Sequence, residues 1–165
     1  MCIRDSYYAA QNGQLSVLRY LIKEKQCDPM CGGKDGWTVL HVAAFLGDLQ
    51  VVQYLIDKCG VDLMSCRDED GDTLLHYAAQ IGQLSVLRYL IKEKQCDPMC
   101  GGRDGRTVLH VAASHSHLQV VQYLIDECGV DPKSCWGNDG DTLLHYVAQK
   151  GQLSVQLSFL SNIVK

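Results

Sequence analysis

Proline, aromatic residues and long hydrophobic runs are scarce in this sequence. It has three prolines in 165 residues, 7% aromatic residues and only short uninterrupted apolar runs. A helix that crosses a bilayer needs about 20 apolar residues, so the sequence predicts no membrane span. The N-terminal region also lacks the apolar h-region of a secretory signal.

An excess of positive charge is missing as well. Lysine and arginine number 15 against 19 aspartates and glutamates, which gives a net charge of −4 and a pI of about 5.8. A general nucleic-acid binder carries a basic footprint, so the sequence argues against that class of function. The 47% hydrophobic and 21% charged residues are ordinary for a folded domain, and the length suits one domain.

The first six residues read Met-Cys-Ile-Arg-Asp-Ser and look like the translation of a transposon-end sequencing adapter. We therefore expect residues 1–6 to be an artefact and leave them out of the fold prediction. The alternative is a native start that matches the adapter by coincidence. If they are an artefact, the natural protein continues upstream and this chain is a fragment.

Two short patterns recur at intervals of 34 or 35 residues, which is typical of a solenoid of stacked repeats. An Asp-Gly pair begins at Asp35, Asp70, Asp104 and Asp139. A Thr-x-Leu-His quartet supplies Thr38 and His41, Thr73 and His76, Thr107 and His110, and Thr142 and His145.

A longer period of 69 residues lies over the shorter one. Residues 9–66 and 78–135 align without gaps and differ at ten of 58 positions, so the duplicated unit is a pair of repeats. The differing pairs are Asn12/Ile81, Lys34/Arg103, Trp37/Arg106, Phe45/Ser114, Leu46/His115, Gly47/Ser116, Asp48/His117, Lys58/Glu127, Leu63/Pro132 and Met64/Lys133.

Each repeat reads as two short helices. In residues 70–100, Gly71 permits a tight turn and Thr73 is placed as a helix N-cap, with apolar residues at helical spacing after it. Gly82 ends this helix, a second amphipathic helix follows, and Pro98 prevents it from continuing. Helices this short are marginal alone, so neighbouring repeats must stack to stabilise them.

These residues resemble the ankyrin repeat. Residues 35–44 follow the family pattern Asp-Gly-x-Thr-Pro-Leu-His-x-Ala-Ala as Asp-Gly-Trp-Thr-Val-Leu-His-Val-Ala-Ala, and the match runs from residue 7 to about 160. The tetratricopeptide repeat has a similar period but lacks both recurring patterns. The resemblance implies an all-α ankyrin-repeat solenoid, with a helix-turn-helix and a β-hairpin-like loop in each repeat.

Three features depart from the family pattern. Its proline is replaced by valine or leucine in all four quartets, which loses some preorganisation of the first helical turn. Gln26 and Gln95 stand where a helix-ending glycine is expected, at a position of left-handed backbone. Ser116 also replaces a glycine, and we expect strain in that loop.

The pattern predicts five repeats after residues 1–6. They are a truncated repeat at 7–34, complete repeats at 35–69, 70–103 and 104–138, and a divergent or capping repeat at 139–165. A polar outer face suits a terminal repeat, and Gln156, Ser158, Ser161 and Asn162 would supply one. A frameshift or cloning junction after Val155 is the competing explanation.

The threonines and histidines of the four quartets are predicted to be structural. Stacked repeats would hold the histidines roughly 8–10 Å apart, too far to share one metal ion. The resemblance implies that each histidine hydrogen-bonds within its own loop and to the next repeat. His115 and His117 have no histidine at their matched positions, and we expect a solvent-facing loop or a partner contact there, with no metal.

Nine cysteines are a high count. Cys27 and Cys96 match Val61 and Val130, where a small hydrophobic residue suits a buried slot. Others recur once per repeat, and stacking should hold them farther apart than the about 4.4–6.8 Å between the Cα atoms of a disulfide. We expect reduced structural thiols and a cytoplasmic location.

No pattern of a catalytic site is present. The sequence lacks a nucleophile–base motif and a paired-carboxylate signature, and neither Gly32-Gly33 nor Gly101-Gly102 precedes the Lys-Ser/Thr of a P-loop. We predict that the chain is not an enzyme and binds no cofactor, metal or small-molecule substrate. It is instead predicted to be a monomeric module that binds another protein.

In ankyrin-repeat proteins, the loop tips and the ends of the first helices line a concave partner-binding face, and the two units differ mainly there. Trp37, Phe45 and Leu46 are expected to form an exposed apolar patch of the kind that marks interfaces. The predicted partner contacts are Trp37, Phe45, Leu46, Asp72, Arg106, His115, His117 and Asp141. The alternatives are unconstrained surface drift, a recognition arm of a larger enzyme or channel, and a passive spacer.

Overall fold

The computed structural model describes residues 2–30, 32, 36–133, 140, 142, 143, 145 and 146. In that part of the chain the helices come in successive pairs, which we number as the first to fourth repeats. The first repeat has α1 (Cys2–Gln11) and α2 (Leu15–Glu24), and the second has α3 (Val39–Leu46), α4 (Leu49–Gln53) and the π-helical turn η1 (Tyr54–Lys58). The third repeat has the 3-10 turn η2 (Leu63–Ser65), α5 (Leu74–Ile81), α6 (Leu84–Arg88) and the π-helical turn η3 (Tyr89–Glu93). The fourth has the 3-10 turn η4 (Arg103–Gly105), α7 (Val108–Ser114), α8 (Leu118–Gln122) and the π-helical turn η5 (Tyr123–Glu127).

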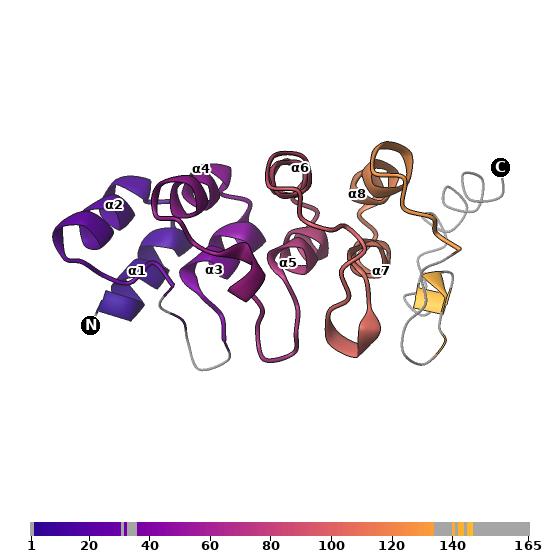
Figure 1. The fold of residues 1–165 in the computed structure, drawn as a ribbon, viewed down its shortest axis with the longest axis horizontal. Coiled ribbons are helices and arrows are strands. Elements are labelled where there is room, and N and C mark those ends of the chain that lie inside the picture. The colour runs from indigo at the N-terminus through magenta and orange to yellow at the C-terminus, as the bar shows by residue number, and fades with distance from the viewer. Residues whose placement is uncertain are drawn as a thin grey trace.

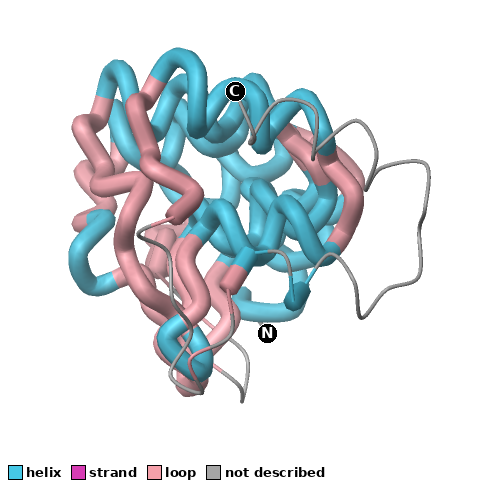
Figure 2. The backbone as a smooth tube through the Cα atoms, turned by 90° about the vertical axis from the view of Figure 1, so that its right-hand side faces the viewer, coloured by secondary structure: helices cyan, strands magenta, loops and turns pink. Residues whose placement is uncertain are grey.

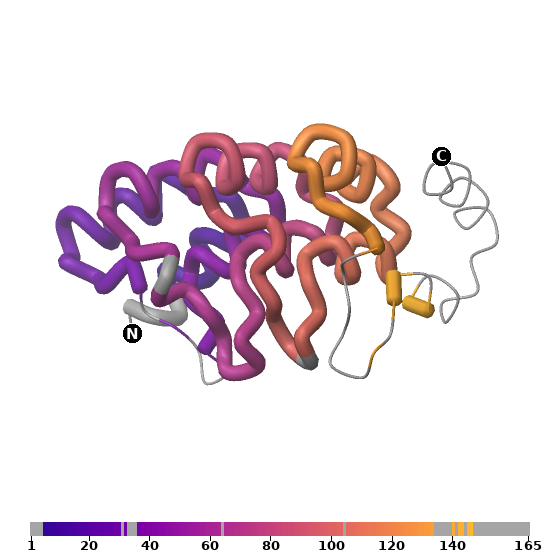
Figure 3. Tube along the Cα trace, turned by 45° about the vertical axis from the view of Figure 1, so that its right-hand side comes forward, coloured from indigo at the N-terminus to yellow at the C-terminus, as the bar shows by residue number. Residues whose placement is uncertain are grey.

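The pairs stack side by side in two rows. Helices α1, α3, α5 and α7 form the inner row, and α2, α4, α6 and α8 form the outer row above it (Figure 1). The loops that join successive repeats extend away from both rows (Figure 3), and a view along the stack shows them gathered on one side of the helices (Figure 2). We call residues 32–38, 67–73 and 101–107 the finger loops.

Each finger loop turns back on itself through a single β-bridge. The bridges join Gly32 to Thr38, Arg67 to Thr73 and Gly101 to Thr107, and the described residues contain no extended strand. The predicted all-α solenoid of helix-turn-helix repeats with hairpin-like loops is therefore confirmed. One difference is that α1 begins at Cys2. Residues 2–6, which the sequence prediction left out as adapter-like, therefore form the first part of this helix.

The inner helices α3, α5 and α7 begin with the same capping box. In α5 the side chain of Thr73 accepts the backbone N–H of His76, and the Nδ1 atom of His76 accepts the backbone N–H of Thr73 at 3.2 Å. A capping box usually has Glu or Gln at this third position. Histidine can replace them only while Nδ1 carries no proton, so the cap requires a neutral ring.

Small residues let the inner helices approach, and leucines fill the space under the outer row. Ala43, Ala44, Ala78 and Ala79 have no exposed surface. The same is true of the leucines that point inward from the outer row, which are Leu18, Leu55, Leu87, Leu90 and Leu124. Burying a leucine contributes roughly 1.5–3 kcal/mol, so these leucines supply much of the stacking energy.

In the second and third repeats, a glycine ends the inner helix and lies close to the next repeat. Gly47 and Gly82 end α3 and α5 with φ of 78° and 80°. A Cβ on Gly47 would collide with the side chain of Gln83, and one on Gly82 would lie 2.5 Å from Nδ1 of His117. The left-handed backbone favours glycine at both positions, and the close His117 ring adds a steric reason at Gly82.

Gln95 has a strained left-handed backbone. Its φ is 55°, and Gln26 and Ser116 share this conformation with φ of 51° and 64°. Gly129 stands at the matched position one repeat later, with open space where a Cβ would be. We expect Gln95→Gly to raise the free energy of unfolding by about 1 kcal/mol, because glycine has no Cβ penalty in this region.

Urea denaturation measures this gain in stability. The reverse change, Gly129→Gln, is the matched control and should lose a similar amount. If the two variants leave the midpoint of unfolding where it is, the left-handed positions carry no strain.

Candidate partner-binding surface

Trp37 lies on a finger loop of the second repeat and packs on the third. Its Nε1–H donates to the hydroxyl of Tyr77 at 2.6 Å, and that hydroxyl donates to Asp68. The rings of Trp37 and Tyr77 meet edge to face with centroids 4.7 Å apart, and the Phe45 ring lies 5.6 Å from that of Trp37. Burial and the bond to Asp68 raise the pKa of Tyr77, so its hydroxyl stays protonated. Trp37 and Phe45 are thus half-buried, and not the exposed patch that the sequence predicted.

Arg106 occupies the place of Trp37 in the second unit and makes an equivalent contact with different chemistry. Its guanidinium carbon lies 5.0 Å from the ring centroid of Tyr146, and this pair has the same spacing along the chain as Trp37 and Tyr77. A cation–π contact therefore replaces an edge-to-face contact. The change alters the chemistry of the surface and keeps the packing on the next repeat.

The ends of the inner helices carry the most exposed apolar side chains of the second and third repeats. Leu46 is 42% exposed and Ile81 is 41% exposed, and each is the last residue of its helix. The matched residues are Asn12 in the first repeat and His115 in the fourth, and both are exposed. Because the inner helices stack side by side, these four residues form a line across the molecule, which we call the edge row.

Asp72 and His117, two more of the predicted partner residues, also make internal hydrogen bonds. Oδ1 of Asp72 accepts the backbone N–H of Arg103 at 2.8 Å, and Nε2–H of His117 donates to the carbonyl of Gln80 at 2.9 Å. Each bond joins neighbouring repeats, so both side chains have a stacking role. Contact of Asp72 and His117 with a partner stays a prediction, and Asp141 lies outside the described residues.

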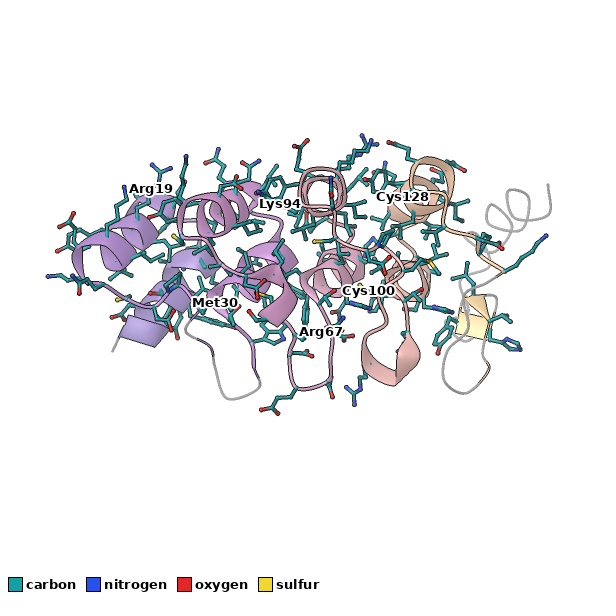
Figure 4. The ribbon with its side chains drawn as sticks, viewed as in Figure 1. Arg19, Met30, Arg67, Lys94, Cys100 and Cys128 are labelled. Atoms are coloured by element: carbon teal, nitrogen blue, oxygen red, sulfur yellow. The ribbon has the colours of Figure 1, made fainter. Side chains whose placement is uncertain are left out.

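Neighbouring finger loops are also held together by charged side chains. Arg67, labelled in Figure 4, donates from its guanidinium to the carbonyls of Gly71 at 2.7 Å and Gly101 at 3.0 Å. Asp70 pairs with Arg103 at 3.1 Å, although both side chains are largely exposed. An exposed pair of this kind stabilises little, and its main effect is to set the charge of the finger loops.

His41 and His76 of the quartets are buried as neutral rings. Desolvation lowers the pKa of His41 and of His76, while the nearby charges of Asp68 and Asp72 partly offset that effect. Nε2–H of His76 donates to the carbonyl of Arg106 at 3.1 Å, so the ring is bonded at one nitrogen to its own cap and at the other to the next repeat. This double attachment positions the finger loop that carries Arg106.

Five cysteines of the described residues are free thiols, namely Cys59, Cys66, Cys96, Cys100 and Cys128. Burial raises the pKa of Cys66 to about 11 and also raises that of Cys96, so both stay protonated and unreactive. Cys27 is disulfide-bonded, which corrects the expectation that every thiol would be reduced. Within the described part of the chain, no three His, Cys, Asp or Glu side chains gather closely enough to hold a metal ion.

A family model described as ankyrin repeats (3 copies) matches residues 6–101 and 94–163. The chain belongs to the ankyrin repeat family. Ankyrin repeats are generally protein–protein interaction modules. No curated protein matches the sequence significantly. No helix among the described residues has the length and apolar character that a membrane span needs.

Two features of this ankyrin stack were missed at the level of sequence. Ile81 was counted only as a difference from Asn12, yet it shares the edge row with Leu46. Tyr77 and Asp68 were not assigned a role, although they hold Trp37 in place. The recurrence of tyrosine at Tyr77 and Tyr146, each 40 residues after Trp37 or Arg106, is the signal that could have identified this contact.

Proposed function

We propose that this ankyrin-repeat chain is a binding module whose protein partner docks on the edge row and the side chains beside it. The contact residues would be Leu46, Ile81 and His115, together with Trp37, Phe45 and Arg106. The supporting observation is where the duplicated units differ. None of the differing side chains that the structure describes is buried, whereas the buried residues of the two units are the same.

The chemistry of this surface suggests what the partner presents. Leu46 and Ile81 lie in the middle of the edge row, with the polar Asn12 and His115 at its ends. An apolar centre with a polar rim is the usual composition of an interface. The partner would therefore place apolar side chains on the centre, and Asp72, His117 and Asp141 would be candidates for the rim.

The wider role of the module is also a proposal. We infer that the chain acts as a monomer in the cytoplasm. The five free thiols among the described residues suit a reducing compartment, whereas the disulfide at Cys27 does not. It would supply recognition and no catalysis of its own. A recognition arm of a larger enzyme or channel would use the same surface, whereas a passive spacer would bind nothing there.

The double variant Leu46→Glu/Ile81→Glu should lose the partner without losing the fold. Both side chains are more than 40% exposed, so stability should change little, whereas two buried charges at an interface should weaken binding at least about 30-fold. The partner is first captured from native lysate with the unaltered chain. Its affinity for each variant is then measured by calorimetry.

Lys58→Glu is the matched control. It adds a negative charge away from the edge row, at a position where the second unit already has glutamate, Glu127. It should leave binding unchanged. Alanine at Trp37, Phe45 and Arg106 together should also release the partner, provided that circular dichroism shows an intact stack. If the same partner still binds to both the double glutamate variant and the triple alanine variant, the interface lies elsewhere on the chain.

A further inference from the structure

The outer row contains one pair of neighbouring segments twice. Helix α2 lies beside α4–η1, and α6–η3 lies beside α8–η5 (Figure 1). Leu15–Glu24 is repeated residue for residue at 84–93. Residues 49–58 are repeated at 118–127, except that Glu127 stands in place of Lys58. The exchange of lysine for glutamate is therefore the one sequence difference between these two pairs of segments.

In the second unit, Glu127 is held between two cations. The guanidinium of Arg88 donates to Oε1 of Glu127 at 2.6 Å, and the ammonium of Lys92 donates to Oε2 at 2.8 Å. Arg88 and Lys92 also lie over the ring of Tyr123, at 4.9 and 5.6 Å from its centroid. The bond from Lys92 lowers the pKa of Glu127, so the carboxylate is ionised at neutral pH. The second unit thus supplies its own anion to these cations.

The first unit has the same two cations and adds a third. The guanidinium carbon of Arg19 lies 5.0 Å from the ring centroid of Tyr54, as the matching arginine lies over its tyrosine in the second unit. Lys58 stands where the second unit has its carboxylate. Within the described part of the chain, none of Arg19, Lys23 and Lys58 forms an ion pair. These three side chains are exposed, so their charges are open to an external anion.

A groove of about 300 Å³ lies between α2 and α4–η1, and its lining is mostly polar. Arg19 and Lys58 line it together with the amides of Gln50 and Gln53, which can donate further hydrogen bonds. Asp57 also lines it, but Lys94 of the third repeat pairs with this carboxylate. Because the negative charge of Asp57 is compensated from the next repeat, it opposes an incoming anion less than an unpaired carboxylate would.

We propose that this groove binds an acidic segment of a partner protein, whose Glu or Asp side chains pair with Arg19, Lys23 and Lys58. Gln50 and Gln53 would donate to oxygens of the same segment. The contact that the chain makes with itself in the second unit shows the chemistry, since each carboxylate oxygen there receives one cation. This surface is on the outer row, separate from the edge row.

The charges around the groove favour a narrow peptide over a flat anionic membrane. Glu24, Glu93, Asp126 and Glu127 are exposed on the same outer row, so a membrane surface laid across it would also meet negative charges. The whole chain has a net charge of −4, so net charge alone would not attract an acidic peptide. Binding must therefore come from the local cluster of cations.

Fluorescence anisotropy with fluorescein-labelled hexaglutamate tests the site, at an ionic strength of about 50 mM to limit screening. Lys58→Glu should weaken binding at least about tenfold, because it removes a cation and gives Arg19 and Lys23 an internal carboxylate. Lys58→Met removes the cation alone and should weaken binding by only about threefold. Labelled hexaglutamine should not bind. If Lys58→Glu binds hexaglutamate as well as the unaltered chain does, the proposal is wrong.

Lys133→Glu is the control for net charge. It makes the same change of charge at an exposed residue of the fourth repeat and should leave the affinity within about twofold. Circular dichroism checks that each variant keeps its fold. An equal loss in Lys133→Glu and Lys58→Glu would show that the peptide responds to overall charge, which would overturn the proposal.

Glu127→Lys should create a second site. It gives residues 118–127 the sequence of residues 49–58 and frees Arg88 and Lys92 from their internal carboxylate. Calorimetry with hexaglutamate should then show two peptides bound per chain where the unaltered chain binds one. A folded Glu127→Lys variant that still binds only one peptide would overturn the proposal.

Two further measurements separate other occupants. Self-association in sedimentation that Lys58→Glu abolishes would assign the groove to the acidic finger loop of a second copy, which contains Asp68, Glu69 and Asp70. Binding to phosphatidylserine vesicles that depends on Lys58 would assign it to a membrane. Either result would overturn the proposal. The edge-row partner should stay bound to Lys58→Glu, so the two proposed surfaces can fail independently.

Discussion

Replacing His76 with alanine should destabilise the fold by about 3–5 kcal/mol. The variant loses the Nδ1 atom that accepts a hydrogen bond from the backbone N–H of Thr73 in the capping box. It also removes the donor to the carbonyl of Arg106, at a side chain that is 2% exposed. Three costs therefore add at one position, namely a lost cap, a lost hydrogen bond to the carbonyl of Arg106, which keeps only its bond from the N–H of Gly102, and a cavity.

Chemical denaturation followed by circular dichroism measures the loss, and two variants separate its causes. His76→Gln keeps a side-chain acceptor at the third position of the helix, so it should recover part of the stability. His115→Ala removes an exposed histidine and should change stability by no more than about 0.5 kcal/mol. A loss at His76→Ala that is no larger than at His115→Ala would show that the capping box is not needed.

The repeat architecture was predictable because its signals are local. The Asp-Gly turns, the threonine caps and the apolar spacing each act within a few residues, and each is repeated. The role of histidine as a capping-box acceptor was harder to foresee, because the usual residue there is Glu or Gln. Only the geometry shows that Nδ1 takes that place and that the ring must be neutral.

The candidate surface was predictable in part. The comparison of the two units pointed to Leu46 and His115, which are exposed on the edge row. It did not show that Trp37 is half-buried, because the contact with Tyr77 joins residues 40 positions apart and depends on how one repeat sits on the next. The exposure of Tyr20 was also beyond sequence reasoning, since the identical segment in the third repeat buries Tyr89.

Lowering the pH from about 7.5 to 5.5 should destabilise the protein through His41 and His76. Burial lowers the pKa of both rings below the ordinary value of about 6.5 that they regain on unfolding. As the pH falls through about 6.5, the unfolded chain takes up protons that the native rings refuse. The free energy of unfolding therefore falls by up to about 1.4 kcal/mol per pH unit for each ring, until the lowered native pKa is reached.

Carboxylates titrate in a separate range, which makes this prediction specific. Pairing with Lys94 lowers the pKa of Asp57, and pairing with Lys92 lowers that of Glu127, so these exposed pairs are lost only at more acidic pH. Denaturation midpoints measured between pH 7.5 and 5.5 should thus report the histidines. The double variant His41→Gln/His76→Gln keeps both acceptors and removes two of the buried rings, so its stability should fall less steeply across this range than that of the unaltered chain. A slope as steep as that of the unaltered chain would mean that the two rings are not the groups that take up protons on unfolding.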